Sequence, residues 1–316
     1  MMIRRTAAGL ALWAAFWLQG FAAEQPPARP LKVRPERTAI FDLAATDGTL
    51  IAVCERGVIL TSKDEGRSWT VIQTPTTRSL TSVVLVSAKT AIAAGHGGTL
   101  MRSDDAGSTW HLIELPEINH DSILGLLARK DGAVIAYGAF GMYLESADAG
   151  VSWKKLTVIK EGFDRHISQV IEFGEKLFLV GESGTMAMSA DNGATWNEIN
   201  SPYQASFFGA LALADNSLLA YGMRGHVFRS TDGGMKWEQV PLATTSALNG
   251  GFADDHGGVV LVGNAGLLAV SRDYGKSFVL SKAPEGLPLS RARFLKDGSI
   301  LYVGYMSNGV RAAGDR

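Results

Sequence analysis

Ser62-Lys63-Asp64-Glu65-Gly66-Arg67-Ser68-Trp69 is the first of six copies of one short phrase in this chain. The phrase returns along the sequence at a nearly constant spacing of 41 to 43 residues, with its serine at Ser103, Ser146, Ser189, Ser230 and Ser271. A fixed period of this size indicates a repeat architecture, in which every copy marks one supersecondary unit. The organisation of the whole chain therefore follows from what this phrase does locally.

Each copy of the phrase, which we call a box, is expected to form a tight hairpin turn. Its carboxylate can accept hydrogen bonds from nearby backbone N–H groups, and its glycine reaches positive φ without strain. The box aspartates are Asp64, Asp105, Asp148, Asp191, Asp232 and Asp273, and the box tryptophans are Trp69, Trp110, Trp153, Trp196 and Trp237. These five are all the tryptophans of the chain apart from Trp13 and Trp17, so we expect them to pack neighbouring repeats together. A calcium site is the alternative, but one aspartate per repeat does not supply the several oxygen ligands that calcium needs.

Four strand patterns surround the box in each repeat. In the first unit they cover residues 38–44, 49–55, 57–62 and 68–73, with turns at Asp47-Gly48 and Arg56-Gly57. Later units show the second of these turns as a Gly-x-x-Gly pattern, for example Gly95–Gly98. Four short strands in about 42 residues are typical of β-propeller blades. Residues 31–316 hold close to seven such periods, so the sequence predicts an all-β, seven-bladed β-propeller with four-stranded blades.

The last unit lacks material for a fourth strand. Its strands are expected at 291–295, 299–305 and 309–312, after which the chain stops. The segment Leu31-Lys32-Val33 precedes the first blade, and we expect it to complete the seventh blade as its fourth strand. This splice would close the ring and remove an exposed strand edge.

The N-terminus is expected to be an export signal over residues 1–23. Arg4 and Arg5 precede an apolar stretch over 7–21, and small residues Ala22 and Ala23 follow it. An uncleaved anchor is the alternative. Residues 24–36 then form a Pro-rich lead-in that includes the closing strand, and 37–316 form one propeller domain. We therefore expect an exported protein, periplasmic, secreted or lumenal.

Composition limits the classes of function. A net charge of −1 with 46% hydrophobic residues does not favour nucleic-acid binding. The single cysteine, Cys54, lies in an apolar strand pattern and is expected to be a buried core residue. None of the six histidines has metal-ligand spacing, so no metal, no cofactor and no catalytic residue is predicted.

Partner binding is expected on the face opposite the boxes, where the second turns and the connections between blades lie. The arginines expected just before innermost strands, around the mouth of the central channel, are Arg37, Arg78, Arg165 and Arg291. The second turns add Arg56, His96, Phe140, Met223 and Arg224. Converging guanidinium groups would favour an anionic or carboxylate-bearing partner. Scattered surface arginines paired with local acids such as Asp121 and Asp164 are the alternative.

A glycan-active enzyme is the competing hypothesis, because such hydrolases need two carboxylates that face one cleft. Glu55 and Glu182 both fall on second turns of the expected binding face. They belong to the first and fourth blades, so we expect them on opposite sides of the channel and too far apart to share a bond.

The boxes and their period resemble the Asp-box, or bacterial neuraminidase repeat, of sialidases, two-domain xyloglucanases, sortilin-type receptors and photosystem II stability/assembly factors. The chain lacks the Phe/Tyr-Arg-Ile-Pro segment of sialidases, for which Val33-Arg34-Pro35 is the nearest candidate. It also has one propeller rather than two, and no Cys-rich module. The photosystem II assembly-factor-like group is therefore the one that it resembles most.

The resemblance implies a WD40- or YVTN-like propeller without catalysis. A member of that group would be an exported, monomeric assembly factor or scaffold that binds a protein partner. The partner would be a membrane-associated complex or a transporter, with the propeller peripheral to the membrane at most. A sialidase-like glycoside hydrolase or a glycan-binding lectin is the alternative implied by the same repeat.

Overall fold

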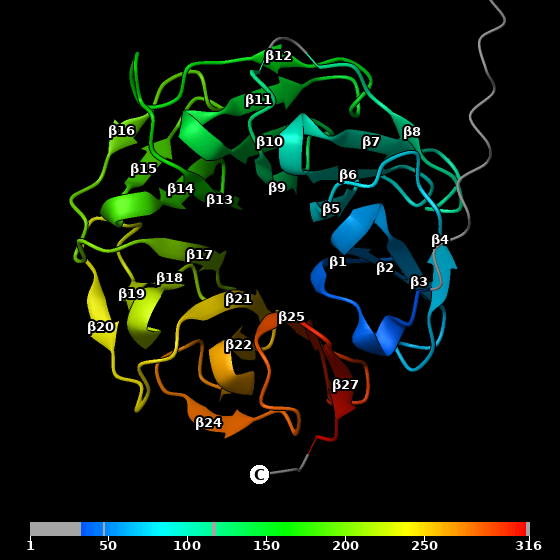
Figure 1. The fold of residues 1–316 in the computed structure, drawn as a ribbon. Helices are drawn as coiled ribbons and strands as arrows, with labels where there is room; N and C mark the ends of the chain where they lie inside the picture. Colours follow the sequence, from blue (N-terminus) through cyan, green and yellow to red (C-terminus); the bar gives the residue numbers. More distant parts are fainter. Residues whose placement is uncertain (1–32, 47, 116–117, 314–316) are drawn as a thin grey trace, which may run out of the picture. The chain divides into compact units, whose positions relative to one another are not determined.

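The computed structural model describes residues 33–46, 48–115 and 118–313. The expected signal over 1–23 and most of the Pro-rich lead-in lie outside these residues. From Val33 onward the chain forms seven antiparallel sheets arranged around a central axis (Figure 1). The predicted seven-bladed β-propeller is confirmed. Among the described residues no helix is long and apolar enough to cross a bilayer.

Each blade is a meander in which consecutive strands pair. The strands are β1 (Ile40–Thr46), β2 (Thr49–Cys54), β3 (Ile59–Ser62) and β4 (Thr70–Ile72); β5 (Leu80–Leu85), β6 (Ala91–Gly95), β7 (Leu100–Ser103) and β8 (His111–Leu112); β9 (Ile123–Ala128), β10 (Val134–Gly138), β11 (Tyr143–Ser146) and β12 (Lys154–Lys155); β13 (Ile167–Phe173), β14 (Lys176–Gly181), β15 (Met186–Ser189) and β16 (Asn197–Glu198); β17 (Phe207–Ala212), β18 (Leu218–Gly222), β19 (Val227–Ser230) and β20 (Glu238–Val240); β21 (Leu248–Ala253), β22 (Val259–Gly263), β23 (Leu267–Ser271) and β24 (Val279–Lys282); β25 (Leu289–Phe294), β26 (Ile300–Gly304) and β27 (Ser307–Arg311).

Short 3-10 turns complete the elements. They are η1 (Pro35–Arg37), before the first blade, and η2 (Glu55–Gly57), η3 (His96–Gly98), η4 (Ala139–Gly141), η5 (Glu182–Gly184), η6 (Met223–Gly225) and η7 (Asn264–Gly266), each between the second and third strands of a blade. The first strand of every blade lies innermost, next to the first strands of its two neighbours (Figure 1). Second strands such as β6 and β10 are buried along their whole length, since both of their faces pack against neighbouring blades.

The hydrophobic core consists of seven clusters, each between two neighbouring blades. Trp110, for example, packs with Ile51 and Val53 of the preceding blade, and Trp237 stacks on Phe178 with ring centroids 5.6 Å apart. The same position in the sixth box is taken by Phe278, which packs between the fifth and sixth blades. The prediction that the box aromatics join neighbouring repeats is confirmed. The seventh blade has no box, and its cluster with the sixth blade contains no box aromatic.

The boxes are structural turns, as the box of Asp148 illustrates. The Ser146 hydroxyl donates to Asp148 Oδ1 (2.7 Å), while the Ser152 N–H donates to Oδ1 (2.9 Å) and its hydroxyl to Oδ2 (2.6 Å). The hydrogen bond from the Ser152 hydroxyl is the main cause that lowers the pKa of Asp148 to about 2. Because its own loop uses both oxygens of this carboxylate, the box serves the fold.

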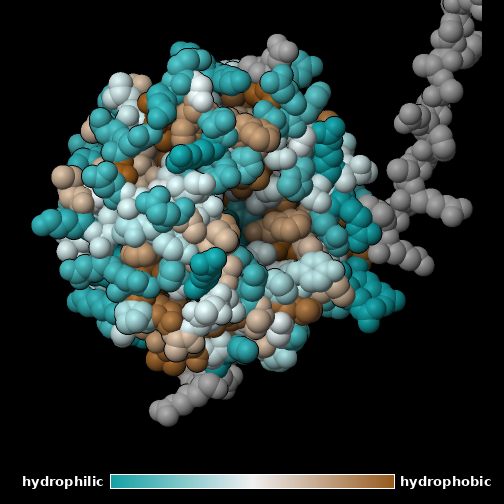
Figure 2. All heavy atoms as spheres, turned by 60° about the vertical axis from the view of Figure 1, so that its left-hand side comes forward, coloured by the Kyte–Doolittle hydropathy of each residue, from teal (hydrophilic) through white to brown (hydrophobic). Residues whose placement is uncertain are grey.

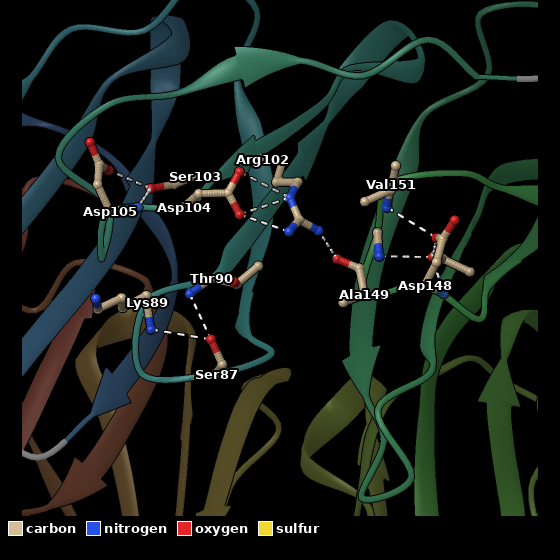
Figure 3. Close-up of polar contacts among 12 residues, drawn as sticks. Ser87, Lys89, Thr90, Arg102, Ser103, Asp104, Asp105, Asp148, Ala149 and Val151 are labelled. Atoms are coloured by element: carbon tan, nitrogen blue, oxygen red, sulfur yellow. Dashed lines mark hydrogen bonds and ion pairs between the residues drawn. The ribbon is translucent and has the colours of Figure 1, made fainter.

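Arginines tie boxes to the preceding blade (Figure 3). Arg102 in β7 pairs with Asp104 (2.7 Å) and donates to the Ala149 carbonyl in the next box. Arg229 occupies the corresponding position in β19 and donates to the Tyr274 carbonyl (2.9 Å). The face that carries these turns, which we call the box face, is therefore held by contacts within the molecule.

The seventh blade has three described strands, β25 to β27. Val33 packs against the cluster between the first and seventh blades, as Val310 and Leu295 also do, and the Asn308 side-chain amide donates to the Pro35 carbonyl (3.1 Å). The incoming chain thus runs beside β27. Leu31 and Lys32 of the expected closing strand lie outside the described residues and Val33 is in no strand, so closure by this segment stays a prediction.

Candidate partner-binding face

The second turn of every blade lies on the face opposite the boxes, together with the connections between blades. The N–H of the first turn residue donates to the carbonyl just before the innermost strand of the same blade, as from His96 to Ser79 (3.0 Å) and from Tyr305 to Pro288 (2.9 Å). We call this surface the second-turn face. The coiled turns face the viewer in Figure 1.

The second residue of these turns has positive φ throughout the ring. In chain order these residues are Arg56, Gly97, Phe140, Ser183, Arg224, Ala265 and Met306. Positive φ strains residues other than glycine, and such strain is often retained at functional sites. Four of the seven blades nevertheless place a long or aromatic side chain there.

Exposed apolar side chains accompany these turns. Phe140 is 61% exposed, and Tyr305 (52%), Met306 (38%) and Met223 (36%) are also exposed. Figure 2 shows mostly hydrophilic residues with small hydrophobic areas between them, and a hollow near the centre of the view. Aromatic, methionine and arginine side chains set among polar ones are the composition of protein-binding hot spots.

Arg78 and Arg165 lie where the sequence placed them. Each stands two residues before the first residue of an innermost strand, β5 or β13, and each is exposed. Arg78 Nη1 donates to the Gly97 carbonyl (2.6 Å) and Arg165 Nη1 to Thr185 Oγ1 (3.4 Å). Both guanidinium groups are thus anchored over the second turn of their own blade.

The other predicted residues of this face lie in its short 3-10 turns. Arg37 is exposed in η1, and Arg56 and Arg224 are exposed middle residues of η2 and η6. Arg56 pairs with Glu55 (3.3 Å), and both side chains are solvent-accessible. His96 begins η3, with Nδ1 3.0 Å from Ser122 Oγ of the next blade.

The prediction that Arg37, Arg78, Arg165 and Arg291 share one position is wrong. Arg291 is the third residue of β25, which begins at Leu289, two residues before the predicted start. Arg37 stands three residues before Ile40 rather than two. The period set by the boxes does not resolve such shifts, because connections between blades differ in length.

Arg291 lies on the channel side of the ring, where it joins the last blade to the first. Its Nε donates to Asp42 Oδ1 (2.8 Å), and its Nη1 donates to the Asn249 carbonyl (3.3 Å). Burial acts to lower the pKa of Arg291, but the Asp42 carboxylate outweighs it and the pKa is raised. Arg291 is therefore committed to holding the ring.

Similar contacts connect other blades along the channel. In three blades the side chain of the third residue of the innermost strand accepts a hydrogen bond from a backbone N–H of the next blade. These bonds run from Val83 to Asp42 (3.1 Å), from Leu126 to Ser82 (3.2 Å) and from Ala210 to Gln169 (2.9 Å). In β9 that position is Gly125, where a Cβ would lie 2.4 Å from the Tyr137 hydroxyl. In β17 Gly209 makes room for Tyr221, and burial raises the pKa of that tyrosine to about 12.

The two carboxylates of the enzyme hypothesis hold the local backbone. Glu55 Oε1 accepts the Ala39 N–H (3.5 Å), and Glu182 Oε2 accepts the His166 N–H (3.1 Å). Each glutamate fixes the start of its own blade's innermost strand. Within the described part of the chain, no group of three or more His, Cys, Asp or Glu side chains could hold a metal ion.

Tyr305 and Met306 are the members of this face that the sequence reasoning missed. It extended the second strand of the last blade to Tyr305, whereas β26 ends at Gly304. The signal was present, since Gly304 follows Gly263 by 41 residues, which is the period of the repeat.

Comparisons with known proteins support this architecture. A family model described as the DUF6242 beta propeller domain matches residues 130–239. A search of curated proteins by sequence found no match.

Solved structures match over most of the chain. A structure of YCF48 bound to a D1 peptide has a TM-score of 0.73 and 17% identity, and covers 89% of this chain and 95% of that one. YCF48 from Cyanidioschyzon merolae has a TM-score of 0.69 and 16% identity over 89% and 97%. The WD40 beta propeller domain of Doa1 has a TM-score of 0.69 and 13% identity, and covers 87% of this chain and 92% of that one. At these identities the likeness establishes the fold alone.

Proposed function

We propose that this chain is a non-catalytic propeller that binds a protein partner through its second-turn face. The observation that carries the proposal is the set of large side chains held at positive φ, namely Arg56, Phe140, Arg224 and Met306. A fold that needs only a turn there would favour glycine or asparagine. The retained strain and the exposed apolar surface are explained if these side chains contact a partner.

We further propose that the protein is an exported, monomeric assembly factor or scaffold for a membrane-associated complex. The apolar stretch near the N-terminus supports export. The structural likeness to YCF48 bound to a D1 peptide supports a peptide or protein as the partner. The use of Glu55 and Glu182 in backbone contacts argues against the glycan-hydrolase alternative.

Site-specific photocrosslinking in the source cell tests the proposed face. A crosslinking amino acid replaces Phe140, Arg224 or Met306, and matched variants carry it at Val151 and Met235, exposed apolar residues of the box face. We expect discrete protein adducts from the first set and none from the second.

The charge contribution is tested in the same cells. Arg56→Glu combined with Arg78→Glu should weaken adduct formation at Phe140 if the partner is anionic there. Adducts that form only from the box face would overturn the proposal. Hydrolysis of a sialoside or xyloglucan by the purified protein would favour the enzyme alternative.

A further inference from the structure

The turn that presents Phe140 is tied to the next blade by a contact that two other blades also make. In three blades the N–H of the positive-φ residue donates to the side chain that immediately precedes the next innermost strand. Arg56 donates in this way to Ser79 Oγ (3.3 Å), and Ser183 to Ser206 Oγ (3.2 Å). Phe140 donates instead to His166 Nδ1 (3.2 Å). One position in the ring therefore replaces a serine acceptor with an imidazole.

We propose that His166 is a pH-sensitive latch that fixes Phe140 on the second-turn face and releases it when the imidazole is protonated. This regulation rests on the proposed function of that face. A serine hydroxyl accepts a hydrogen bond at every pH, whereas Nδ1 accepts only while it carries no proton. The Phe140 N–H accordingly assigns the ring hydrogen to Nε2 in the neutral form. Imidazole is also the side chain that changes charge between pH 5 and 8.

A carboxylate that can accept a hydrogen bond from the protonated imidazole lies beside His166. Glu182 Oε2 lies 3.8 Å from His166 Nδ1, and the two side chains are 46% and 44% exposed. When the imidazole is protonated, Nδ1 carries a hydrogen and can no longer accept a hydrogen bond from the Phe140 N–H. The new Nδ1–H can instead donate a hydrogen bond to the Glu182 carboxylate. The cation is therefore drawn from the turn toward the carboxylate.

The turn depends on this contact for the placement of its exposed ring. Phe140 has φ of 53°, and its ring meets the His166 imidazole edge to face, with centroids 5.0 Å apart at 83°. Movement of the imidazole removes both the hydrogen bond and the ring contact. The flanking bonds, from the Ala139 N–H to Ser122 and from the Gly141 N–H to Arg165, do not involve the imidazole and keep the rest of η4 in place.

Other charged groups surround the latch from each neighbouring element. η4 carries none, and Glu182 is the one on η5. The connection before His166 carries Asp164 and Arg165. A shallow cavity beside Phe140, about 160 Å³ in volume, is lined by the charged residues Asp121, Lys155, Lys160 and Glu161. Carboxylates are at least as numerous as cations in this set, so it does not oppose a protonated imidazole.

The experiment follows the Phe140 amide in the free protein. Protein labelled with ¹⁵N-phenylalanine gives one amide signal for each phenylalanine that it contains, and Phe140→Leu identifies the signal of interest. We expect this signal to shift between pH 8 and 5 with the same midpoint as the His166 ring signals. In His166→Ser, which restores the acceptor used by two other blades, the shift should be absent.

Amide hydrogen exchange supplies the magnitude. At pH 5 we expect Phe140 to exchange about fivefold faster in wild type than in His166→Ser, the effect of one lost hydrogen bond, and at equal rates at pH 8. The latch would be overturned by a Phe140 amide signal that stays constant while the His166 ring signals shift. It would also be overturned by a Phe140 shift with the same pH midpoint in wild type and in His166→Ser. No partner is needed, so failure here leaves the crosslinking result untouched, and failed crosslinking at Phe140 leaves the latch untouched.

Discussion

Replacement of Arg291 by methionine should destabilise the propeller strongly, because it breaks the ion pair between the last and first blades. The Asp42 side chain is only 12% exposed and that of Arg291 is 34% exposed, with Nε and Oδ1 2.8 Å apart. Without Arg291, Asp42 keeps three neutral donors, the Leu43 N–H, the Ser82 hydroxyl and the Val83 N–H. At this separation and an effective dielectric constant of about 20, the Coulomb attraction is on the order of 4–6 kcal/mol before desolvation is subtracted.

A double-mutant cycle measures what remains of that attraction. We expect Arg291→Met and Asp42→Asn each to lower the free energy of unfolding by about 3 kcal/mol, with a coupling energy of about 2 kcal/mol after allowance for desolvation and the partial exposure of Arg291. The control is the surface pair Lys160–Glu198, 3.3 Å apart with side chains 66% and 59% exposed, whose coupling should stay below about 1 kcal/mol. Guanidinium denaturation followed by tryptophan fluorescence gives all values. A coupling for Asp42 and Arg291 no larger than that of the control would refute the reasoning.

Three further perturbations have defined outcomes. The pKa of Asp148 is lowered to about 2, chiefly by the Ser152 hydroxyl. The ionised carboxylate therefore stabilises the fold fully above the unfolded pKa near 4, and this stabilisation is lost as pH falls toward 2. Asp148→Asn should flatten the plot of unfolding free energy against pH between these values, and an unchanged slope would contradict this. If the predicted closing strand forms, a chain that starts at Arg34 should denature at lower guanidinium concentration than one that starts at Ala28, whereas equal midpoints would exclude it. Arg102→Met should cost about 1–3 kcal/mol in the same assay, since it removes donors to the next box, and a change near zero would show that the boxes do not need this tie.

Features that repeat along the sequence could be predicted well. The boxes fix their own turns through contacts within a few residues, so the blade count and the packing of Trp110 and Trp237 followed from their spacing. Features that depend on one blade alone were harder. The start of β25 was misplaced by two residues, and Arg291 was assigned to the binding face instead of the channel.

Contacts between distant positions account for the rest. The pairing of Asp42 with Arg291 joins residues 249 positions apart, and nothing in the local pattern of either strand specifies it. The placement of Tyr137 over Gly125 likewise depends on the exact offset between two strands. These details need the three-dimensional register, which periodicity alone does not supply.

Closure of the ring between its first and last blades has a consequence for synthesis of the protein. Cys54 and Leu60 of the first blade are covered by Leu301 and Val303 of the last. At 5–20 residues per second, roughly 12 to 50 s separate the synthesis of Asp42 from that of Arg291, and during this time the first blade presents an apolar side to its surroundings. Cys54 is the only cysteine and is fully buried in the finished ring, so it should react with a thiol reagent only before the ring closes. The loss of this reactivity would mark the point at which the apolar side of the first blade is covered and no longer needs chaperones.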